Sequence, residues 1–357
     1  MGDTDFGLLE DQHHLAAYLL ERGLLEDGEQ LSVAYLGGGI SNRIALISTP
    51  RQAFVLKQAQ PKLKVKVDWF APVHRVLIEA EAMEAWRPML PPGTVPEILF
   101  IDRQRFLYAM EAAPPDSVLW KVRLMRGEVD LGVARAVGEI LGRMHSGTAT
   151  DAGVRGRFQD RRILQALRID PCFRYLIGVY PHLEPAIGEQ VERLEAPGLC
   201  LVHGDYTPKN MLVSGSCITL LDYEIAHWGN PALDSGFIVA HLLLKAIHAP
   251  EWADSYVKAA WMLWTKYVGQ VTFADTSALE KETAWIVPFL MLARIDSKSP
   301  VEYIVAEDRK EVARRVSLRL IERPIDSLGA ILEHVVETVR ESTPTSSERR
   351  ARDVGHR

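Results

Sequence analysis

Short apolar runs fill the first third of the chain, a pattern typical of β-strands. Each run is too short for a helix, and Gly, Pro, Asn or charged residues bound it. The predicted strands cover residues 32–36, 44–48, 53–57, 97–102 and 106–111. Gly37 to Gly39 join the first two strands, and Arg103-Gln104 joins the last two into a hairpin. The pattern therefore predicts a small β-rich unit near the N-terminus.

Helical spacing of apolar residues precedes and interrupts these strands and dominates the rest of the chain. One helix is expected over residues 12–22 and another over 73–86, which Pro88 ends. From about Ser117 onward, helical patterns prevail. Short strands are expected within that part near residues 200–203, 211–213 and 218–222.

This separation of a β-rich first third from an α-rich remainder predicts an α+β protein with two lobes. The joint falls at residues 111–115, where two prolines end a strand and stiffen a linker. The expected parts are an N-terminal helical segment 1–30, a small N-lobe 31–113, a large helical C-lobe 114–340 and a disordered Ser/Thr/Arg-rich tail 341–357.

Composition removes several classes of protein from consideration. A net charge of −6 argues against a nucleic-acid partner, which requires a strongly basic face. Three cysteines without a CxxC pair predict buried thiols in a reducing compartment rather than disulfides or a zinc site. The acidic first residues are not typical of a signal peptide, and the apolar stretch 237–244 is too short to span a bilayer. A cytoplasmic location without a membrane partner is expected.

The strongest chemical pattern lies in the second half of the chain. Asp205 stands five residues before Asn210, and Asp222 and Glu224 follow after a short predicted hairpin. This spacing is the catalytic-loop pattern of kinases. Phosphoryl transfer uses one carboxylate to orient a hydroxyl, and amide and carboxylate oxygens to hold Mg²⁺. Each residue alone would be explained as a turn or a cap, but together they favour Asp205 as catalytic and Asn210, Asp222 and Glu224 as metal ligands.

The glycine turn of the first lobe is a candidate phosphate-binding loop. Gly38, Gly39, Ser41 and Asn42 lie between two predicted strands, where backbone N–H groups can face a phosphate. Three glycines between two strands more often form a mobile turn. The run matches neither the Walker pattern nor the dinucleotide fingerprint, so those two nucleotide-binding folds are disfavoured.

Lys57 is the candidate cation for the α- and β-phosphates of a nucleotide. It ends a predicted strand among apolar neighbours, and the following helix offers Glu79 or Glu81 to pair with it. Glu79 is preferred because Met83 and Trp86 continue its side of the helix as an apolar stripe facing the lobe core.

These motifs together resemble the aminoglycoside phosphotransferase and choline kinase superfamily over nearly the whole chain to about residue 340. Within it, the first lobe is most similar to methylthioribose kinase, through residues 55–59, 68–72 and 75–80 and the D-x-E pair at 222–224. The catalytic loop from Tyr206 to Asn210 and the segment 297–303 depart from that enzyme.

The resemblance implies a protein-kinase-like bilobal fold, with ATP as phosphoryl donor, Mg²⁺ as cofactor and a monomer or homodimer. It also implies that Trp69 lies near the nucleotide, that Glu111 and Ala113 offer backbone groups to adenine, and that Asp234 braces the catalytic loop. Glu224 would then assist Asp222 at the metal.

The sequence therefore predicts a kinase that phosphorylates a hydroxyl of a small molecule, such as the sugar-like methylthioribose. One alternative is an antibiotic kinase for aminoglycosides or macrolides, although the acidic residues of 150–200 alternate with arginines and form no cluster. Another is a nucleotide-binding pseudokinase, which the presence of Lys57, Asp205 and Asp222 disfavours.

Four further side chains near these motifs are interpreted as structural or solvated. Packing is the preferred role for His227 and Trp228, and solvation at a helix end is preferred for Arg294 and Lys298. An acceptor contact is the less favoured role for each of them.

Overall fold

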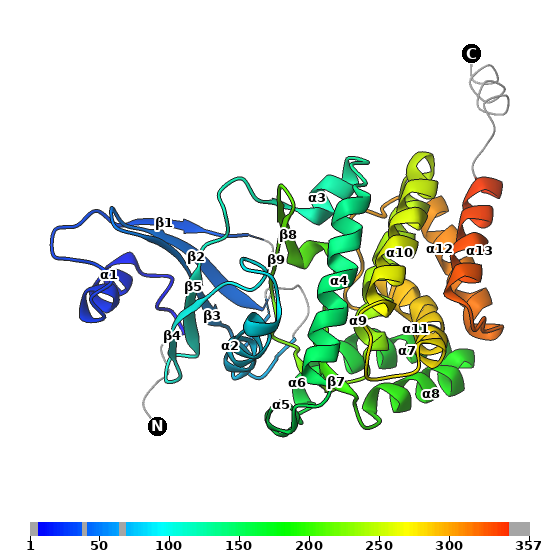
Figure 1. The fold of residues 1–357 in the computed structure, drawn as a ribbon, viewed down its shortest axis with the longest axis horizontal. Coiled ribbons are helices and arrows are strands. Elements are labelled where there is room, and N and C mark those ends of the chain that lie inside the picture. Colours follow the sequence, from blue (N-terminus) through cyan, green and yellow to red (C-terminus); the bar gives the residue numbers. More distant parts are fainter. Residues whose placement is uncertain (1–5, 38–40, 64–68, 343–357) are drawn as a thin grey trace, which may run out of the picture.

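The chain forms two lobes that meet after strand β5 (Leu107–Glu111), as Figure 1 shows. The computed structural model describes residues 6–37, 41–63 and 69–342. The smaller lobe is built on an antiparallel sheet, and the larger lobe is mainly helical. The predicted α+β bilobal fold is confirmed.

The N-lobe sheet has the strand order β1-β2-β3-β5-β4, and each neighbouring pair is antiparallel. Its strands are β1 (Ser32–Tyr35), β2 (Asn42–Ser48), β3 (Ala53–Ala59), β4 (Ile98–Asp102) and β5. Helices α1 (Gln12–Glu21) and α2 (Arg75–Trp86) pack on opposite faces of the sheet. Each predicted strand and helix of this lobe is present, with bounds that differ by a few residues.

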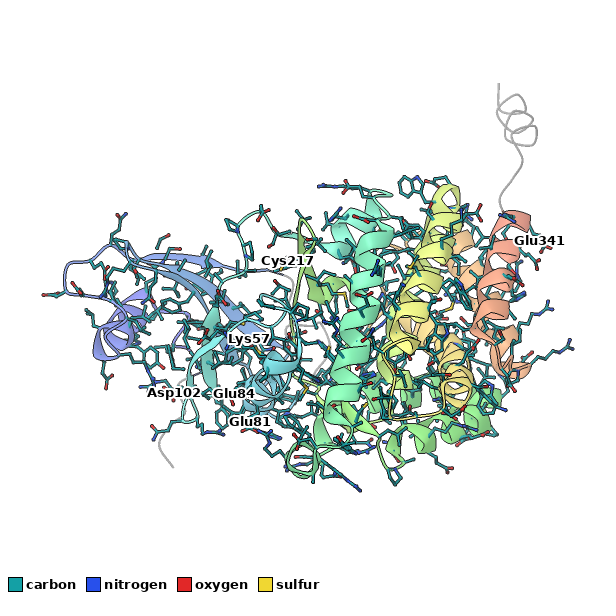
Figure 2. All side chains as sticks on the ribbon, in the orientation of Figure 1. Lys57, Glu81, Glu84, Asp102, Cys217 and Glu341 are labelled. Atoms are coloured by element: carbon teal, nitrogen blue, oxygen red, sulfur yellow. The ribbon has the colours of Figure 1, made fainter. Side chains whose placement is uncertain are left out.

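Alternation along β3 decides which side chains point toward which helix. Phe54 and Leu56 join the apolar cluster that includes α1, whereas Val55 joins the cluster that includes α2. Successive side chains of a strand point to opposite faces, so Lys57 lies on the same face as Val55. This register turns Lys57 toward α2 and the C-lobe (Figure 2).

Helix α1 is also held to the sheet by a buried charge. Asp102, at the end of β4, accepts hydrogen bonds from the Tyr18 hydroxyl at 2.9 Å and from Arg22 at 2.7 Å. The Asp102 side chain is 5% exposed, and the Arg22 guanidinium stacks on the rings of Tyr18 and Phe100. The pair thus fixes the end of α1 to the outer strand of the sheet.

The C-lobe is a helical bundle around α9, a helix whose side chains are buried almost all round. A helix that is mainly apolar on every side is stable in the centre of a lobe and not on its surface. The helices are α3 (Trp120–Met125), α4 (Leu131–Thr148), α5 (Ala152–Arg157), α6 (Arg162–Leu164), a π-helical segment (Gln165–Arg174), α7 (Tyr175–Val179), α8 (Glu184–Glu195), α9 (Ala232–His248), α10 (Ala253–Val268), α11 (Thr276–Asp296), α12 (Glu307–Glu322) and α13 (Leu328–Glu341).

Short strands at the lobe junction carry the catalytic motifs. Strands β8 (Met211–Ser214) and β9 (Cys217–Leu220) form a hairpin whose register pairs Met211 with Leu220. Asn210 and Asp222 therefore flank the open end of this hairpin, one before its first strand and one after its second. The predicted strands are all present here, while β6 (Val118–Leu119) and β10 (His227–Gly229) were not predicted.

Within the described ranges, no helix taken singly has the length and apolar composition to cross a bilayer. Helices 232–248 and 250–268, bent by 120° at their junction, meet that test only as a pair. Apart from Glu341, which ends α13, and Ser342, the predicted tail lies outside the described residues.

Candidate active site

A buried aspartate holds the catalytic loop in shape. Asp234, in the first turn of α9, accepts the backbone N–H of His203 at 2.6 Å and that of Gly204 at 2.8 Å, as predicted. Its Oδ2 also lies 3.1 Å from Nε2 of His145. Burial would raise the pKa of Asp234, but these hydrogen bonds, led by His145, lower it. Gly204 has φ +77°, and a side chain there would meet the Ile225 backbone, so the tight turn requires glycine.

Replacing Asp234 with asparagine should lower the free energy of unfolding by about 1–3 kcal/mol, because one of the two loop N–H groups loses its acceptor. The native carboxylate has a lowered pKa, so its stabilisation is present above pH 3.8 and lost as pH falls through the folded-state pKa. Urea unfolding at several pH values checks this. If the free energy of unfolding of Asp234→Asn falls at acid pH as steeply as that of the wild type, the prediction is wrong.

His203 packs inside the loop rather than facing the cavity. It is fully buried, its Nε2 lies 3.1 Å from the Leu221 carbonyl, and its ring stacks near Trp86 and Tyr223. Burial lowers the pKa of His203, so the imidazole is held neutral.

Asp205 and Asn210 lie side by side in this loop, and both are buried. The Asn210 amide Nδ2 donates to Oδ2 of Asp205 at 3.0 Å and to its backbone carbonyl at 2.9 Å. Because the amide nitrogen is used in this way, the side-chain carbonyl oxygen of Asn210 is the atom left for a metal ion. Metal binding by Asn210 stays a prediction.

Three cations surround the Asp205 carboxylate. Arg168 lies 2.8 Å from it, Lys209 2.9 Å and Arg294 4.0 Å. Burial would raise the pKa of Asp205, but these cations, Arg168 foremost, hold it well below its ordinary value. Asp205 is therefore ionised throughout the physiological pH range and can accept a hydrogen bond from a hydroxyl.

Lys57 bridges the two lobes through two carboxylates. Its Nζ donates to Glu79 on α2 and to Asp222 after β9, each at 2.8 Å. The predicted choice of Glu79 over Glu81 agrees with the structure, since Glu81 contacts Arg103 instead. Burial would lower the pKa of Lys57, but Asp222 and Glu79 raise it, so the ammonium stays charged.

Asp222 has an uncommon backbone conformation, with φ +67°. Aspartate tolerates this left-handed region better than most residues, and non-glycine residues held there are enriched at functional sites. The turn aims the Asp222 carboxylate at the cavity, where 28% of its side chain is exposed.

Glu224 contacts the N-lobe through both of its oxygens. Ser41 donates to Oε1 at 2.8 Å, and Asn42 donates to Oε2 at 2.7 Å. Arg75, at the start of α2, also donates to Oε2, at 3.1 Å. The two loop residues that the sequence assigns to a nucleotide, Ser41 and Asn42, are thus buried against Glu224.

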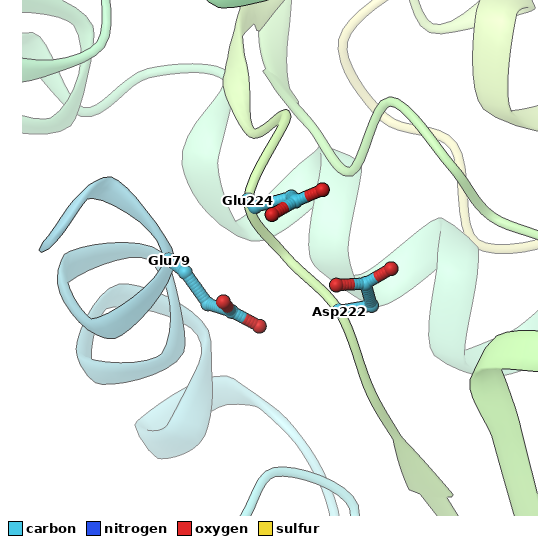
Figure 3. Close-up of side chains that lie close together, drawn as sticks. All are labelled: Glu79, Asp222 and Glu224. Carbon is cyan, nitrogen blue, oxygen red and sulfur yellow. The ribbon is translucent and has the colours of Figure 1, made fainter. Parts of the chain in front are cut away.

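Figure 3 shows the carboxylates of Glu79, Asp222 and Glu224 gathered at the lobe junction; each offers an oxygen within 4.8 Å of the others. The Glu79 and Glu224 side chains are almost wholly buried, whereas 28% of the Asp222 side chain is exposed at the cavity, so Asp222, with Asn210, is the better placed to hold a cation. These donors are all oxygens, which suits a hard divalent ion such as Mg²⁺. A direct metal bond from Glu224 stays a prediction.

A cavity of about 710 Å³ joins these groups, in the range of small-molecule sites. Residues of both lobes line it, including Glu111 and Ala113 after β5 and Trp69, whose indole donates to the Ala166 carbonyl at 3.0 Å. Gly38 and Gly39 lie outside the described residues. The other predicted site residues all line this cavity: Ser41, Asn42, Lys57, Glu79, Asp205, Asn210, Asp222 and Glu224.

Sequence reasoning missed several cationic side chains of the site. It gave no role to Arg168, Lys209 or Lys245, and it treated Arg75 only as part of a resemblance. The preferred reading of Arg294 as a solvated helix-end charge is wrong: it is 6% exposed and lines the cavity. Only the four-residue spacing of Lys209 from Asp205 offered a local signal.

The structure agrees with the preferred interpretations of the three other side chains, Lys298, His227 and Trp228. Lys298 is exposed, as predicted. His227 and Trp228 are buried in packing, and neither belongs to the cavity lining. The Trp228 indole donates to the Gly198 carbonyl at 2.8 Å instead.

The smaller lobe is β-rich and carries a Lys–Glu pair. The larger lobe is helical and carries a braced Asp–Asn loop and a second aspartate. Together these features define a kinase-like phosphotransferase. Residues 32–265 match the model of the phosphotransferase enzyme family. The chain belongs to this family.

Curated relatives include methylthioribose kinase of Geobacillus thermodenitrificans, 24% identical over 265 residues, which are 66% of this chain and 66% of that protein. Methylthioribose kinase 2 of Oryza sativa subsp. japonica is 23% identical over 270 residues, 66% of this chain and 63% of that protein. The chain thus spans about two thirds of the length of these relatives.

Solved structures share the fold at low identity. An amicoumacin kinase in complex with AMP-PNP, Ca²⁺ and Ami superposes with a TM-score of 0.53 at 14% identity, covering 92% of this chain and 94% of that one. Plasmodium vivax ethanolamine kinase gives 0.53 at 12% identity, covering 95% of this chain and 90% of that one. The likeness extends over both lobes.

Proposed function

We propose that this protein is an ATP- and Mg²⁺-dependent kinase that transfers the γ-phosphoryl group to a hydroxyl of a small molecule. The observation that carries the proposal is a single cavity lined by Lys57, Asp205, Asn210 and Asp222 at the lobe junction. Family membership and the named kinases among its relatives support it.

The residues divide the work between the two substrates. Lys57, held by Glu79, would contact the phosphates of the donor, and Asp205 would receive the hydroxyl of the acceptor. A divalent cation on Asn210 and Asp222 would neutralise charge on the phosphates. Positioning and charge stabilisation supply most of the rate in this chemistry.

In the transfer step, the acceptor oxygen bonds to the γ-phosphorus while the bond from phosphorus to the β–γ bridging oxygen breaks. ADP leaves with that electron pair. The pKa of Asp205 is low, so it orients the hydroxyl first and takes the proton late, once bonding to phosphorus has made that proton strongly acidic. The proton then passes to water.

The test is ADP release by the full chain with ATP and Mg²⁺, against methylthioribose, other sugars, hydroxy acids, amino alcohols, aminoglycosides and macrolides. We expect turnover that depends on an acceptor and stops when EDTA removes the divalent ion. Acceptor-dependent turnover that persists in EDTA would contradict the metal assignment. Failure to bind ATP in the presence of Mg²⁺ would overturn the proposal itself.

A further inference from the structure

One face of α9 forms a wall of the cavity next to Asp205. Phe237, His241 and Lys245 recur at four-residue spacing and therefore share a side of the helix. His241 and Lys245 line the cavity. The guanidinium groups of Arg168 and Arg294 lie over the Phe237 ring, at 5.5 Å and 5.3 Å from its centroid. We call Arg168, His241, Lys245 and Arg294 the acceptor wall.

The acceptor wall carries more positive charge than its neighbours neutralise. Arg168 and Arg294 both approach the single carboxylate of Asp205, which Lys209 also contacts. Glu302, another lining carboxylate, is paired with Lys121. Among the described residues around the acceptor wall, Lys245 therefore has no carboxylate within ion-pair distance.

Several nitrogen atoms of the acceptor wall lack a good hydrogen-bond partner. Neither Nε of Arg294 nor Nε2 of His241 has a hydrogen-bond partner in the described part of the chain. Lys245 is 1% exposed and makes one long hydrogen bond, to the His241 carbonyl at 3.4 Å. Burial, together with the nearby charge of Lys121, lowers the pKa of Lys245 to about 7. Burying cations without a counter-charge is costly, so the wall has capacity for an anionic group.

We propose that the acceptor carries an anionic oxygen group, a carboxylate or a phosphate, on the same molecule as the hydroxyl that is phosphorylated. This inference rests on the proposed kinase function and names its substrate class. The anion would lie against Arg294 and Lys245, while the hydroxyl meets Asp205. A polycationic aminoglycoside or a quaternary amine would bring further positive charge against a wall that already has an excess.

The experiment compares matched acceptors that differ in charge. D-glycerate is compared with glycerol, and ribose 5-phosphate with ribose, so that the carboxylate and phosphate arms are separate. Choline serves as the cationic arm. Each is titrated by calorimetry into the full chain saturated with Mg²⁺ and a non-hydrolysable ATP analogue, so that the nucleotide phosphate sites are filled. We expect at least one anionic member to bind about 10-fold or more tightly than its neutral partner.

Variants of the wall locate the preference. Arg294→Gln should abolish most of it, Arg294→Lys should retain part of it, and binding of the nucleotide analogue should be unchanged in both. Lys245→Met, which keeps a long unbranched side chain but removes the ammonium that lies over the Tyr303 ring, is a second test if Arg294→Gln folds poorly. Lys298→Gln, at an exposed lysine, is the matched control and should bind as the wild type does.

The inference is overturned if neither anionic acceptor binds more tightly than its neutral partner, or if the preference survives both Arg294→Gln and Lys245→Met. Choline binding as tightly as the anions would also overturn it. Failure of the nucleotide analogue to bind, in contrast, would count against the kinase function and would be seen in the first titration, before any acceptor is added.

Discussion

Replacing Asp205 with asparagine should reduce turnover by about 10²–10⁴-fold while ATP still binds, because the acceptor hydroxyl loses the carboxylate that orients it. Asparagine preserves the shape and keeps an oxygen beside Arg168. Since the nucleotide contacts assigned to Lys57 and Asp222 do not involve Asp205, the loss should fall on kcat. Steady-state ADP release together with calorimetric ATP affinity measures both quantities.

The Asp308→Asn variant is a suitable control, because the native Asp308 side chain is 73% exposed and its nearest cation, Arg309, lies 3.8 Å away. It should leave both quantities unchanged. The native Asp205 stands among three cations, so thermal unfolding of Asp205→Asn must also be measured. Turnover near the wild-type rate in a folded Asp205→Asn protein would remove Asp205 from the mechanism.

Replacing Arg75 with methionine should lower the free energy of unfolding by about 3–5 kcal/mol, since it leaves the buried Glu224 carboxylate without its cation. Arg75 is fully buried and also donates to the carbonyls of Ala71, Pro72 and Gln60 and, through a short contact, to that of Ser41. These groups lie on separate loops of the N-lobe, and Glu224 belongs to the C-lobe. Urea unfolding measures the loss, and ATP affinity should fall with it.

A double-mutant cycle with Glu224→Gln separates the ion pair from the carbonyl contacts. If the pair links the lobes, Arg75→Met should cost less in the Glu224→Gln background than alone. The matched control is Arg87→Met, whose ion pair with Glu97 is about half exposed and should contribute at most about 1 kcal/mol. Strictly additive effects at Arg75 and Glu224 would show that the pair does not couple the lobes.

The part of the site that is local in sequence could be predicted from it. Asp205, Asn210 and Asp222 lie within one loop and one hairpin, so their spacing fixes their proximity once the hairpin forms. Glu79 was chosen over Glu81 because helical periodicity reports which side of α2 faces the core. The same reasoning located the strands of the N-lobe, whose alternation is visible in the residues themselves.

The acceptor side could not be predicted, because it is assembled by tertiary packing. Arg168 comes from a π-helical segment, Lys245 from α9 and Arg294 from the end of α11, and no short-range pattern connects them. Arg294 resembles an ordinary helix-end cation in sequence and is buried only because the segment after α11 folds back, with Ser299 accepting from it at 2.9 Å. Burial of long cations is decided by such contacts and not by local composition.

The separate origins of the two halves of the cavity have an evolutionary consequence. The groups assigned to phosphate chemistry come from β3, α2 and the β8–β9 hairpin, whereas the acceptor wall comes largely from α9, α11 and the π-helical segment. Asp205 is the point at which the two sets meet. Substitutions on the pocket face of α9 can therefore accumulate in a lineage and redirect the enzyme to another acceptor, while the inherited phosphoryl-transfer apparatus is left untouched.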